Sequence, residues 1–271
     1  MSSESLVKRR KYDCLSRVHD NVPFSNLSLI GTNESFSFYR KVSKRHRHQS
    51  WDLSEQIYQG VRVFELTLAW LNNDIVITYG RHVIREFDSF MKEVNQYMRY
   101  LHPKECFFLI LKRSNEFPFE MSASHILDTL YSKYQTCVLY DENKKLSELR
   151  GKVWILNFFD LNHISMSFVQ DKQVTGMDSG IKAKIANRKN QLKSENKQSC
   201  VRIVNFQGSG IKFYNPLVNY KSFAKRLSDS EIYDIPKDVP AIFMFDFPEM
   251  FVSEGYDFIE VLMSRNYNLT Y

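Results

Sequence analysis

The chain has 271 residues, of which 43% are hydrophobic, 14% aromatic and 25% charged, and this composition is typical of a soluble globular protein. It excludes collagen-like and disordered chains, and the longest apolar runs, such as Cys106–Leu111, are far shorter than the roughly 18 residues of a membrane-spanning helix. The formal net charge of +6 favours anionic partners, such as lipid headgroups or nucleic acids.

The beginning of the chain, MSSESLVKRRKYDCLSR, has charges but no apolar segment and no small-residue cleavage site, so it does not resemble a secretory signal. The 4 cysteines form no C-x-x-C pair, which is typical of reduced thiols and argues against a zinc cluster; they are Cys14, Cys106, Cys137 and Cys200. We therefore expect a cytoplasmic protein. Peripheral membrane association is one further option, and nuclear entry through the short basic run Lys8–Lys11 is another.

Short runs of β-branched and aromatic residues predict a series of strands. Most of these runs are apolar on both faces, as strands buried in a parallel sheet are. In chain order they are Leu27–Ile30, Val61–Leu66, Ile75–Tyr79, Phe107–Leu111, Val153–Phe159, Val201–Phe206 and Ala241–Phe247. A helix is predicted from Ile84 to Leu101, because its apolar residues recur every three or four positions and Pro103 ends it.

This alternation of strands and helices predicts an α/β fold, and the number of strands favours a single irregular (β/α) barrel of the TIM type over a doubly wound sheet. The connection between Leu66 and Ile75 is too short for a crossover helix, so an irregularity is expected there. We assign residues 1–14 to a basic N-terminal tail and residues 15–271 to one barrel domain. A basic polar insertion or surface helix is expected at about residues 178–198.

Basic residues are bunched along the chain. They gather at Lys8–Lys11, at Arg40–His48 (RKVSKRHRH) and along Lys182–Lys197, where Glu195 is the only acidic residue. A solvated face or a surface loop is the plainest interpretation of each cluster. Contact with phosphate groups, of lipid or of nucleic acid, is the functional alternative.

The common catalytic fingerprints are absent: the sequence has no G-x-G-x-x-G, no Walker loop, no H-E-x-x-H and no G-x-S-x-G. An α/β barrel places its functional side chains at the C-terminal ends of its strands. Those ends carry the candidate site residues Asn33, Glu34, Glu65, Thr67, Tyr79, Lys112, Arg113 and Asp246.

The candidate strand ends lie in recognisable segments: Leu27–Ser35 reads LSLIGTNES, Gln59–Leu66 reads QGVRVFEL, and Ile75–Gly80 reads IVITYG. In this order they resemble the ISIPGTHDS-type opening, the strand ending F-D-I-R and the strand ending His-His-Gly of one family. That family is the X domain of bacterial-type phosphatidylinositol-specific phospholipase C. The later segments FFLILKR, LRGKVWIL, VQDK and IFMFDF continue the resemblance, which covers most of Leu15–Asn266.

The resemblance implies a phosphodiesterase barrel. In such enzymes one histidine deprotonates the inositol 2-hydroxyl, which attacks phosphorus, and a second histidine protonates the departing diacylglycerol; both must titrate near neutral pH. The charge on the phosphate is met by an arginine in bacterial forms, or by calcium held on carboxylates and an amide in eukaryotic forms.

Key positions of that machinery are substituted in this chain. The first histidine position is Asn33, whose amide cannot accept a proton near neutral pH. The second is Tyr79, and a tyrosine hydroxyl, with a pKa of about 10, is a poor acid. The arginine position is Thr67, which has no charge. The resemblance therefore implies that phosphodiesterase activity has been lost.

Other positions of the family are retained. Asp246 matches the aspartate that orients the first histidine, Asp171 matches an aspartate of the inositol pocket, and Lys112, or its neighbour Arg113, matches a basic inositol contact. Asp246 lies in an apolar strand and could equally be a buried carboxylate bonded to the backbone or to Asn33.

Two acidic residues, Glu34 and Glu65, stand where the family has acidic or calcium-binding residues. Two carboxylates are a thin calcium site, because this ion takes six to eight oxygen ligands. We therefore expect no cofactor and no bound calcium.

We interpret the chain as a phospholipase-C-like barrel that has lost its acid and base and binds inositol phospholipid or an anionic membrane surface. One alternative is an active phosphoric diester hydrolase that uses Glu34 or Glu65 as base and Tyr79 or His82 as acid. The other alternative is a protein that binds nucleic acid through its basic clusters. No pattern in the sequence indicates an oligomeric state.

Two further segments bear on these alternatives. His46 and His48 lie in the basic segment Arg40–His48, and an imidazole from this loop could reach the pocket in place of the missing ones. The loop Asn115–Met121 (NEFPFEM) follows the strand that carries Lys112, and its phenylalanines either cap the core or enter a bilayer.

Overall fold

The computed structural model describes residues 13–100, 103–117, 122–139, 144–158, 166–168, 174–175, 186, 201–206, 211–212, 224–225, 228, 239–253 and 256–269. The strands are β1 (Leu29–Thr32), β2 (Val61–Leu71), β3 (Asp74–Tyr79), β4 (His82–Glu86), β5 (Phe107–Arg113), β6 (Cys137–Leu139), β7 (Val153–Phe158), β8 (Met166–Phe168), β9 (Val174–Thr175), β10 (Val201–Phe206), β11 (Ile211–Lys212), β12 (Ile242–Phe245), β13 (Val252–Ser253) and β14 (Tyr256–Asp257). The α-helices are α2 (Leu53–Tyr58), α3 (Phe87–Tyr100), α4 (Ala123–Lys133), α5 (Leu146–Leu149) and α8 (Phe258–Met263). Short 3-10 helices are η1 (Phe24–Asn26), η2 (Lys44–His46), η4 (Pro248–Phe251) and η5 (Ser264–Leu269).

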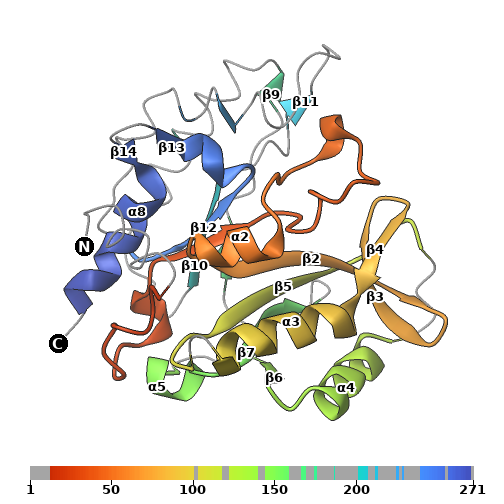
Figure 1. The fold of residues 1–271 in the computed structure, drawn as a ribbon, viewed down its shortest axis with the longest axis horizontal. Helices are drawn as coiled ribbons and strands as arrows, with labels where there is room; N and C mark the ends of the chain where they lie inside the picture. Colours follow the sequence, from red (N-terminus) through yellow and green to blue (C-terminus); the bar gives the residue numbers. More distant parts are fainter. Residues whose placement is uncertain are drawn as a thin grey trace.

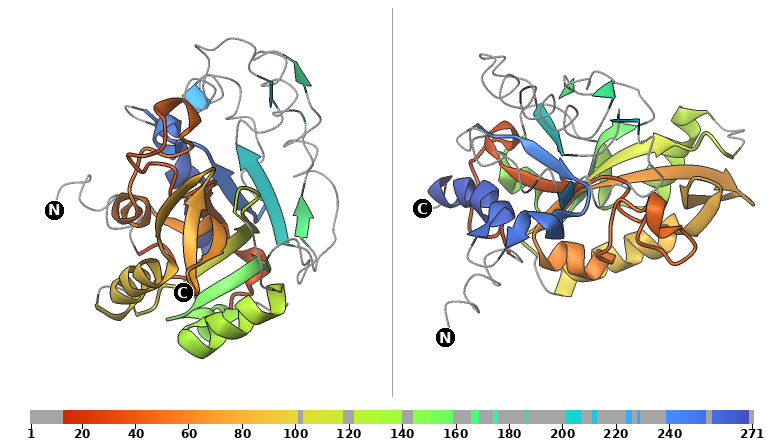
Figure 2. Two further views of the ribbon diagram at one scale, coloured as in Figure 1. Left: turned by 90° about the vertical axis from the view of Figure 1, so that its right-hand side faces the viewer. Right: turned by 90° about the horizontal axis from the view of Figure 1, so that it is seen from above.

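The main sheet is built from parallel strands in the order β6-β7-β5-β2-β1-β12-β10-β8. The strands curl into a half-barrel, with α3 and α4 on its outside (Figures 1 and 2). This confirms the α/β fold and the TIM-type barrel predicted from the apolar runs. Because all these strands run the same way, their C-terminal ends meet at one rim of the barrel.

The irregularity expected between Leu66 and Ile75 is an antiparallel hairpin. Strand β2 continues to Leu71, and a turn at Asn72 and Asn73 returns the chain as β3, which pairs with β2 and then with β4. The turn residues have φ of 51° and 62°, a left-handed conformation that asparagine tolerates and that two-residue hairpins require. Figure 1 shows β3 and β4 projecting beyond the rest of the sheet.

The helix predicted from Ile84 begins three residues later, at Phe87. Ile84 lies in β4, because the residues after the turn at Gly80 pair back onto β3 before the helix starts. From Phe87 on, the apolar stripe is as predicted, and Phe87, Phe90, Met91 and Val94 are fully buried against the sheet. The apolar spacing thus located the buried face of α3 but not its first turn.

The cysteines that the structure describes are Cys14, Cys106 and Cys137; all are buried, and none forms a disulfide. Cys14 belongs to the hydrophobic core, so packed structure extends at least that far toward the N-terminus. In the part of the chain that is described, no helix combines the length and apolarity needed to span a bilayer. The basic clusters Lys8–Lys11 and Lys182–Lys197 lie almost wholly outside the described residues.

Candidate active site

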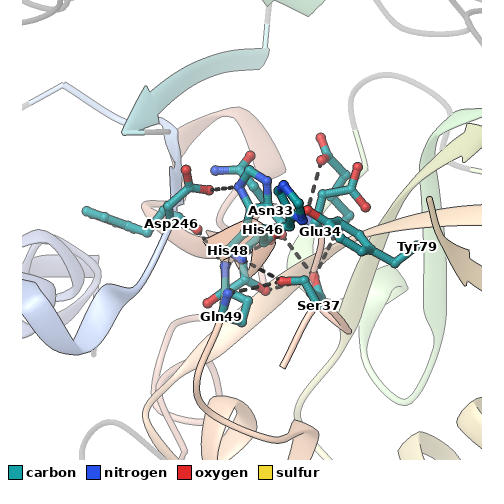
Figure 3. A network of polar contacts seen from close by, with 12 residues as sticks. Asn33, Glu34, Ser37, His46, His48, Gln49, Tyr79 and Asp246 are labelled. Carbon is teal, nitrogen blue, oxygen red and sulfur yellow. Dashed lines mark hydrogen bonds and ion pairs between the residues drawn. The ribbon is translucent and has the colours of Figure 1, made fainter. Parts of the chain in front are cut away.

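Most of the site residues predicted from the sequence meet at the C-terminal rim of the barrel. Asn33 and Glu34 follow β1, Glu65 and Thr67 belong to β2, Tyr79 ends β3, Lys112 belongs to β5, and Asp246 follows β12. Figure 3 shows Asn33, Glu34, Tyr79 and Asp246 around one point, and Lys112 joins them through its contact with Glu65. The barrel therefore brings together side chains that are up to 213 positions apart in the sequence, from Asn33 to Asp246.

Two predicted residues are exposed at the edge of this group. His82 lies on β4, paired with Tyr79 across the turn at Gly80, and Arg113 lies at the end of β5. Asp171 lies outside the described residues. Of the two basic residues proposed as inositol contacts, Lys112 is thus the one that lies within the rim cluster.

The central contact of the site is between His48 and Asp246. The Nδ1 atom of His48 lies 2.9 Å from Oδ1 of Asp246, and both side chains are buried (Figure 3). The segment Arg40–His48, from which an imidazole was expected to be able to reach the pocket, thus supplies one to Asp246. This segment belongs to the connection between β1 and α2.

Asp246 changes the proton affinity of this imidazole. Burial by itself lowers the pKa of His48, but the charge of Asp246 and its hydrogen bond act in the opposite direction, with smaller contributions from Glu34 and Glu65. The net effect raises the pKa of His48 above its ordinary value of 6.5. The imidazole therefore binds its proton more tightly than a free imidazole in water does.

Glu34 has a pKa near neutrality. Burial and the neighbouring charge of Glu65 raise the pKa of Glu34 from 4.5 to about 7, although Lys112, His48 and a hydrogen bond from Thr67 act against the rise. The Thr67 hydroxyl donates to Oε2 of Glu34 over 3.2 Å. The backbone of Glu34 has a φ of 42°, a left-handed and strained conformation that is common at functional sites.

Lys112 supplies the positive charge of the cluster. Its ammonium lies 2.8 Å from Oε1 of Glu65. Burial lowers the pKa of Lys112, but Glu65 and Glu34 more than compensate, so the pKa is raised and the side chain stays charged. The carboxylate of Glu65 is thus already paired with the ammonium of Lys112. Among the described residues no group of three or more metal-ligating side chains could hold an ion, and the absence of calcium stays a prediction.

Tyr79 contacts the loop that carries His48. Its hydroxyl donates a hydrogen bond to the backbone carbonyl of His46, and its ring lies 6.0 Å from the ring of His48. The proton that Tyr79 would give as an acid is therefore engaged with the loop. The narrow hollow lined by Glu34, Thr67 and Tyr79 has no room for a water-sized sphere, so it is not a ligand-sized pocket.

Two hydrogen bonds hold the backbone of Asn33 in place. Its N–H donates to the Phe245 carbonyl over 3.0 Å, and its own carbonyl accepts from Nε2 of Gln49 over 2.8 Å. Both polar atoms of its side chain are buried without a hydrogen-bond partner among the described residues. The amide therefore lies beside the catalytic candidates but cannot take their proton-transfer role.

His48 was not among the site residues chosen from the sequence, although its loop was noted as able to reach the pocket. Two signals in the sequence point to it: a histidine pair inside the connection that follows β1, and an aspartate after β12 that has lost its family partner. The two residues are 198 positions apart, so only the fold brings them together.

Neither the family models nor the curated proteins compared with this chain give a match. Solved structures do match over nearly the whole chain. A variant of the phosphatidylinositol-specific phospholipase C of Staphylococcus aureus has a TM-score of 0.74 and 16% identity, covering 96% of this chain and 97% of its own. A second variant of that enzyme has a TM-score of 0.75 and 16% identity, covering 96% and 98%.

The phosphatidylinositol-specific phospholipase C of Listeria monocytogenes has a TM-score of 0.72 and 15% identity, covering 94% of this chain and 98% of its own. Nearly complete coverage in both directions means that the two chains share one architecture from end to end. The chain has the fold of the bacterial phosphatidylinositol-specific phospholipases C.

Proposed function

We propose that this chain is a phospholipase-C-like phosphodiesterase whose proton-transfer groups are His48, oriented by Asp246, and Glu34. The observation that carries the proposal is the 2.9 Å contact between His48 and Asp246 at the rim of a phospholipase C fold. An aspartate that orients an imidazole is the arrangement by which many hydrolases hold a general base in one tautomer. An imidazole held by a carboxylate, with a second titratable group near enough to interact with it, is the minimum for acid–base catalysis.

His48 acts as the general base in this proposal. Because Nδ1 donates to Asp246, proton exchange with a ligand falls to Nε2. The Nε2 atom takes the proton of a hydroxyl that attacks the phosphorus of a phosphodiester. Asp246 then stabilises the imidazolium that forms, since its carboxylate lies directly against the ring.

Glu34 acts as the general acid. With a pKa of about 7, it is protonated in half of the molecules at neutral pH, whereas an ordinary glutamate is almost fully ionised. It gives its proton to the oxygen of the departing alcohol as the phosphorus–oxygen bond breaks. The ammonium of Lys112 offsets part of the phosphate charge, in place of the arginine that Thr67 has replaced.

The substrate class that fits is a phosphodiester of an anionic lipid headgroup, as in phosphatidylinositol. Arg40, Lys41 and Lys44 are exposed in the same loop as His48 and would bring the rim to an anionic membrane surface. Basic residues alone do not distinguish lipid from nucleic acid, which remains the less favoured partner. We propose that the protein acts at a membrane surface as a peripheral protein, and that Asp171 contributes to the headgroup pocket as the family resemblance implies.

A second candidate is a module that binds the same headgroup without turnover. Two observations favour it: Thr67 brings no charge to the phosphate, and the Tyr79 hydroxyl is engaged with His46. A general acid and a general base contribute about 10²–10⁴-fold each, so a site without working acid–base groups binds but turns over negligibly.

The test measures hydrolysis and binding together on phosphatidylinositol vesicles, for the natural chain, His48→Ala and the control His82→Ala. His82 is an exposed histidine outside the site. We expect release of inositol phosphate by the natural chain and by His82→Ala, and a loss of about 10²-fold or more in His48→Ala with vesicle binding retained. Binding without release in the natural chain would replace the first candidate by the second. Neither binding nor release, with a salt-dependent shift of RNA in a gel, would favour a nucleic-acid partner.

A further inference from the structure

The imidazole of the site comes from a loop, and the structure shows how that loop is held. We call Ser37–Gln49, the segment between β1 and α2, the His48 loop. Its two ends close on each other through one hydroxyl: Oγ of Ser37 accepts from the backbone N–H of His48 over 2.8 Å and from that of Gln49 over 3.0 Å. The loop is therefore a closed unit whose ends are joined directly below the imidazole.

Gln49 fastens this unit to the barrel. Its Nε2 atom donates to the carbonyl of Asn33 over 2.8 Å and to the carbonyl of Phe245 over 2.9 Å. These carbonyls end β1 and β12, neighbouring parallel strands, and Phe245 immediately precedes Asp246. A single buried carboxamide thus ties the loop to both strand ends beside the aspartate that receives the imidazole.

Two other contacts fix the remaining sides of the loop. The backbone N–H of Phe247 donates to the carbonyl of His48 over 2.8 Å, from a residue whose φ of 48° is left-handed. A side-chain-bearing residue adopts that conformation only where its surroundings hold it there. On the opposite side, the Tyr79 hydroxyl donates to the carbonyl of His46.

We propose that Gln49 is a positioning residue of the site: its carboxamide anchors the His48 loop to the ends of β1 and β12 and thereby sets the imidazole against Asp246. Only an uncharged amide suits this place. One nitrogen must donate two hydrogen bonds, and a cation or an anion would add a charge beside the His48–Asp246 pair. The expected loss of turnover without this anchor rests on the proposed function, whereas the expected change in the pKa of His48 does not.

The experiment compares Gln49→Met with Gln56→Met in the full chain. Methionine keeps the length and volume of glutamine but removes both donors. Gln56 is the matched control: it is as fully buried as Gln49, and its Nε2 also donates to two carbonyls, those of Ser35 and Trp51. Three quantities are measured: the pKa of His48 by NMR titration of the ring, assigned with His48→Ala; the midpoint of urea unfolding; and hydrolysis of phosphatidylinositol vesicles.

We expect both variants to lower the unfolding midpoint, Gln56→Met by more, because Oε1 of Gln56 also accepts from the Thr32 hydroxyl whereas Oε1 of Gln49 has no partner among the described residues. Only Gln49→Met should bring the pKa of His48 down toward 6.5 and reduce hydrolysis by about 10²-fold, the loss typical of a catalytic group displaced by about 1 Å. An unchanged His48 titration in Gln49→Met, or an equal change in both variants, would reduce Gln49 to a structural role and overturn the proposal.

Two contingencies keep the experiment decisive. If Gln49→Met does not fold, Gln49→Asn replaces it, since asparagine keeps the donors but is one methylene too short to reach both carbonyls; the same outcomes apply. If the natural chain does not hydrolyse the lipid, the proposed function fails, and the His48 titration still decides whether Gln49 positions the ring.

Discussion

The two ends of the barrel bury charge in opposite ways. At the N-terminal end, Arg62 at the start of β2 and Glu105 just before β5 form a fully buried ion pair of 2.7 Å. Each also makes further hydrogen bonds: Glu105 accepts the N–H groups of Leu15 and Ser16, and Arg62 donates to the carbonyls of Ile57 and Val61.

At the C-terminal end, the buried groups have shifted pKa values. The pKa of His48 is raised above its ordinary value, that of Glu34 is raised to about 7, and the side-chain amide of Asn33 has no partner among the described residues. A buried group whose polar atoms are all satisfied serves the fold, whereas a buried group held near its titration point is suited to chemistry. The same barrel therefore has a fully bonded ion pair at one rim and a cluster of titratable groups with shifted pKa values at the other.

The largest expected effect is at the stable end. Glu105→Ala would leave the Arg62 guanidinium buried without its counter-ion and would orphan the N–H groups of Leu15 and Ser16. We expect the free energy of unfolding, measured with urea, to fall by about 3–5 kcal/mol. Glu93→Ala, which breaks a half-buried pair with Arg85, is the control and should cost less than about 1 kcal/mol. Equal losses in the two variants would contradict the contrast between buried and surface pairs.

Removing the proposed acid should have the next largest effect. Glu34→Gln cannot give up a proton, so we expect hydrolysis to fall by about 10²-fold at neutral pH. In the natural chain, hydrolysis should decline as the pH rises above about 7, where Glu34 loses its proton, and that limb should vanish in the variant. A pH–rate profile of the same shape for both proteins would assign the acid role elsewhere.

The raised pKa of Glu34 also predicts how the stability of the fold depends on pH. Because the pKa of Glu34 is raised from 4.5 to about 7, the folded chain binds more protons than the unfolded chain in that range. Stability therefore falls as the pH rises from 4.5 through 7. Glu34→Gln should be as stable as the natural chain below this window and more stable above it, as measured by urea unfolding at several pH values.

The stability that the His48–Asp246 pair contributes should also fall with rising pH, but over a different pH range. The pKa of His48 is raised above 6.5, so the contribution of the pair is complete below pH 6.5 and is lost as the pH rises through the raised value. His48→Gln should therefore cost most stability below pH 6.5, and the difference from the natural chain should shrink at higher pH. A difference that does not depend on pH would mean that the imidazole is held neutral.

The smallest expected effect concerns Thr67. Thr67→Val keeps the shape of the side chain and removes the hydroxyl that donates to Glu34. Since that hydrogen bond opposes the rise of the Glu34 pKa, its loss should move the alkaline limb of the hydrolysis profile to slightly higher pH. Thr78→Val, on the neighbouring β3, removes a hydroxyl that donates to the Thr67 carbonyl and should leave the limb in place. A downward shift in Thr67→Val would contradict the assignment.

The sequence predicts the barrel well because its strands are continuous apolar runs. Val61–Leu66 and Phe107–Leu111 form the cores of β2 and β5 as expected, and the short connection after Leu66 becomes a hairpin. Strand ends such as Glu65 and Lys112 could be placed at the rim because parallel strands end at the same edge. The start of α3 was misplaced, because Ile84 suits a strand and a helix face equally.

The imidazole beside Asp246 could not be predicted in the same way. Its position depends on Ser37, Gln49 and Phe247, whose contacts join the loop to strand ends from distant parts of the chain. No spacing in the sequence reports such contacts, and the loop itself reads as a basic surface segment. The family resemblance directed attention to Asn33 and Asp246 but not to the loop residue that contacts Asp246.

Because the imidazole comes from a loop, its position and the strands of the barrel depend on different residues. When a proton-carrying side chain belongs to a strand, any change that displaces it also disturbs the ladder around it. Here the ring is carried by a closed loop that is fastened through the side chains of Ser37 and Gln49, so a change at either residue would move the imidazole and leave the strands in place. The proton affinity of the ring could thus change through two loop positions, with no change in the sheet.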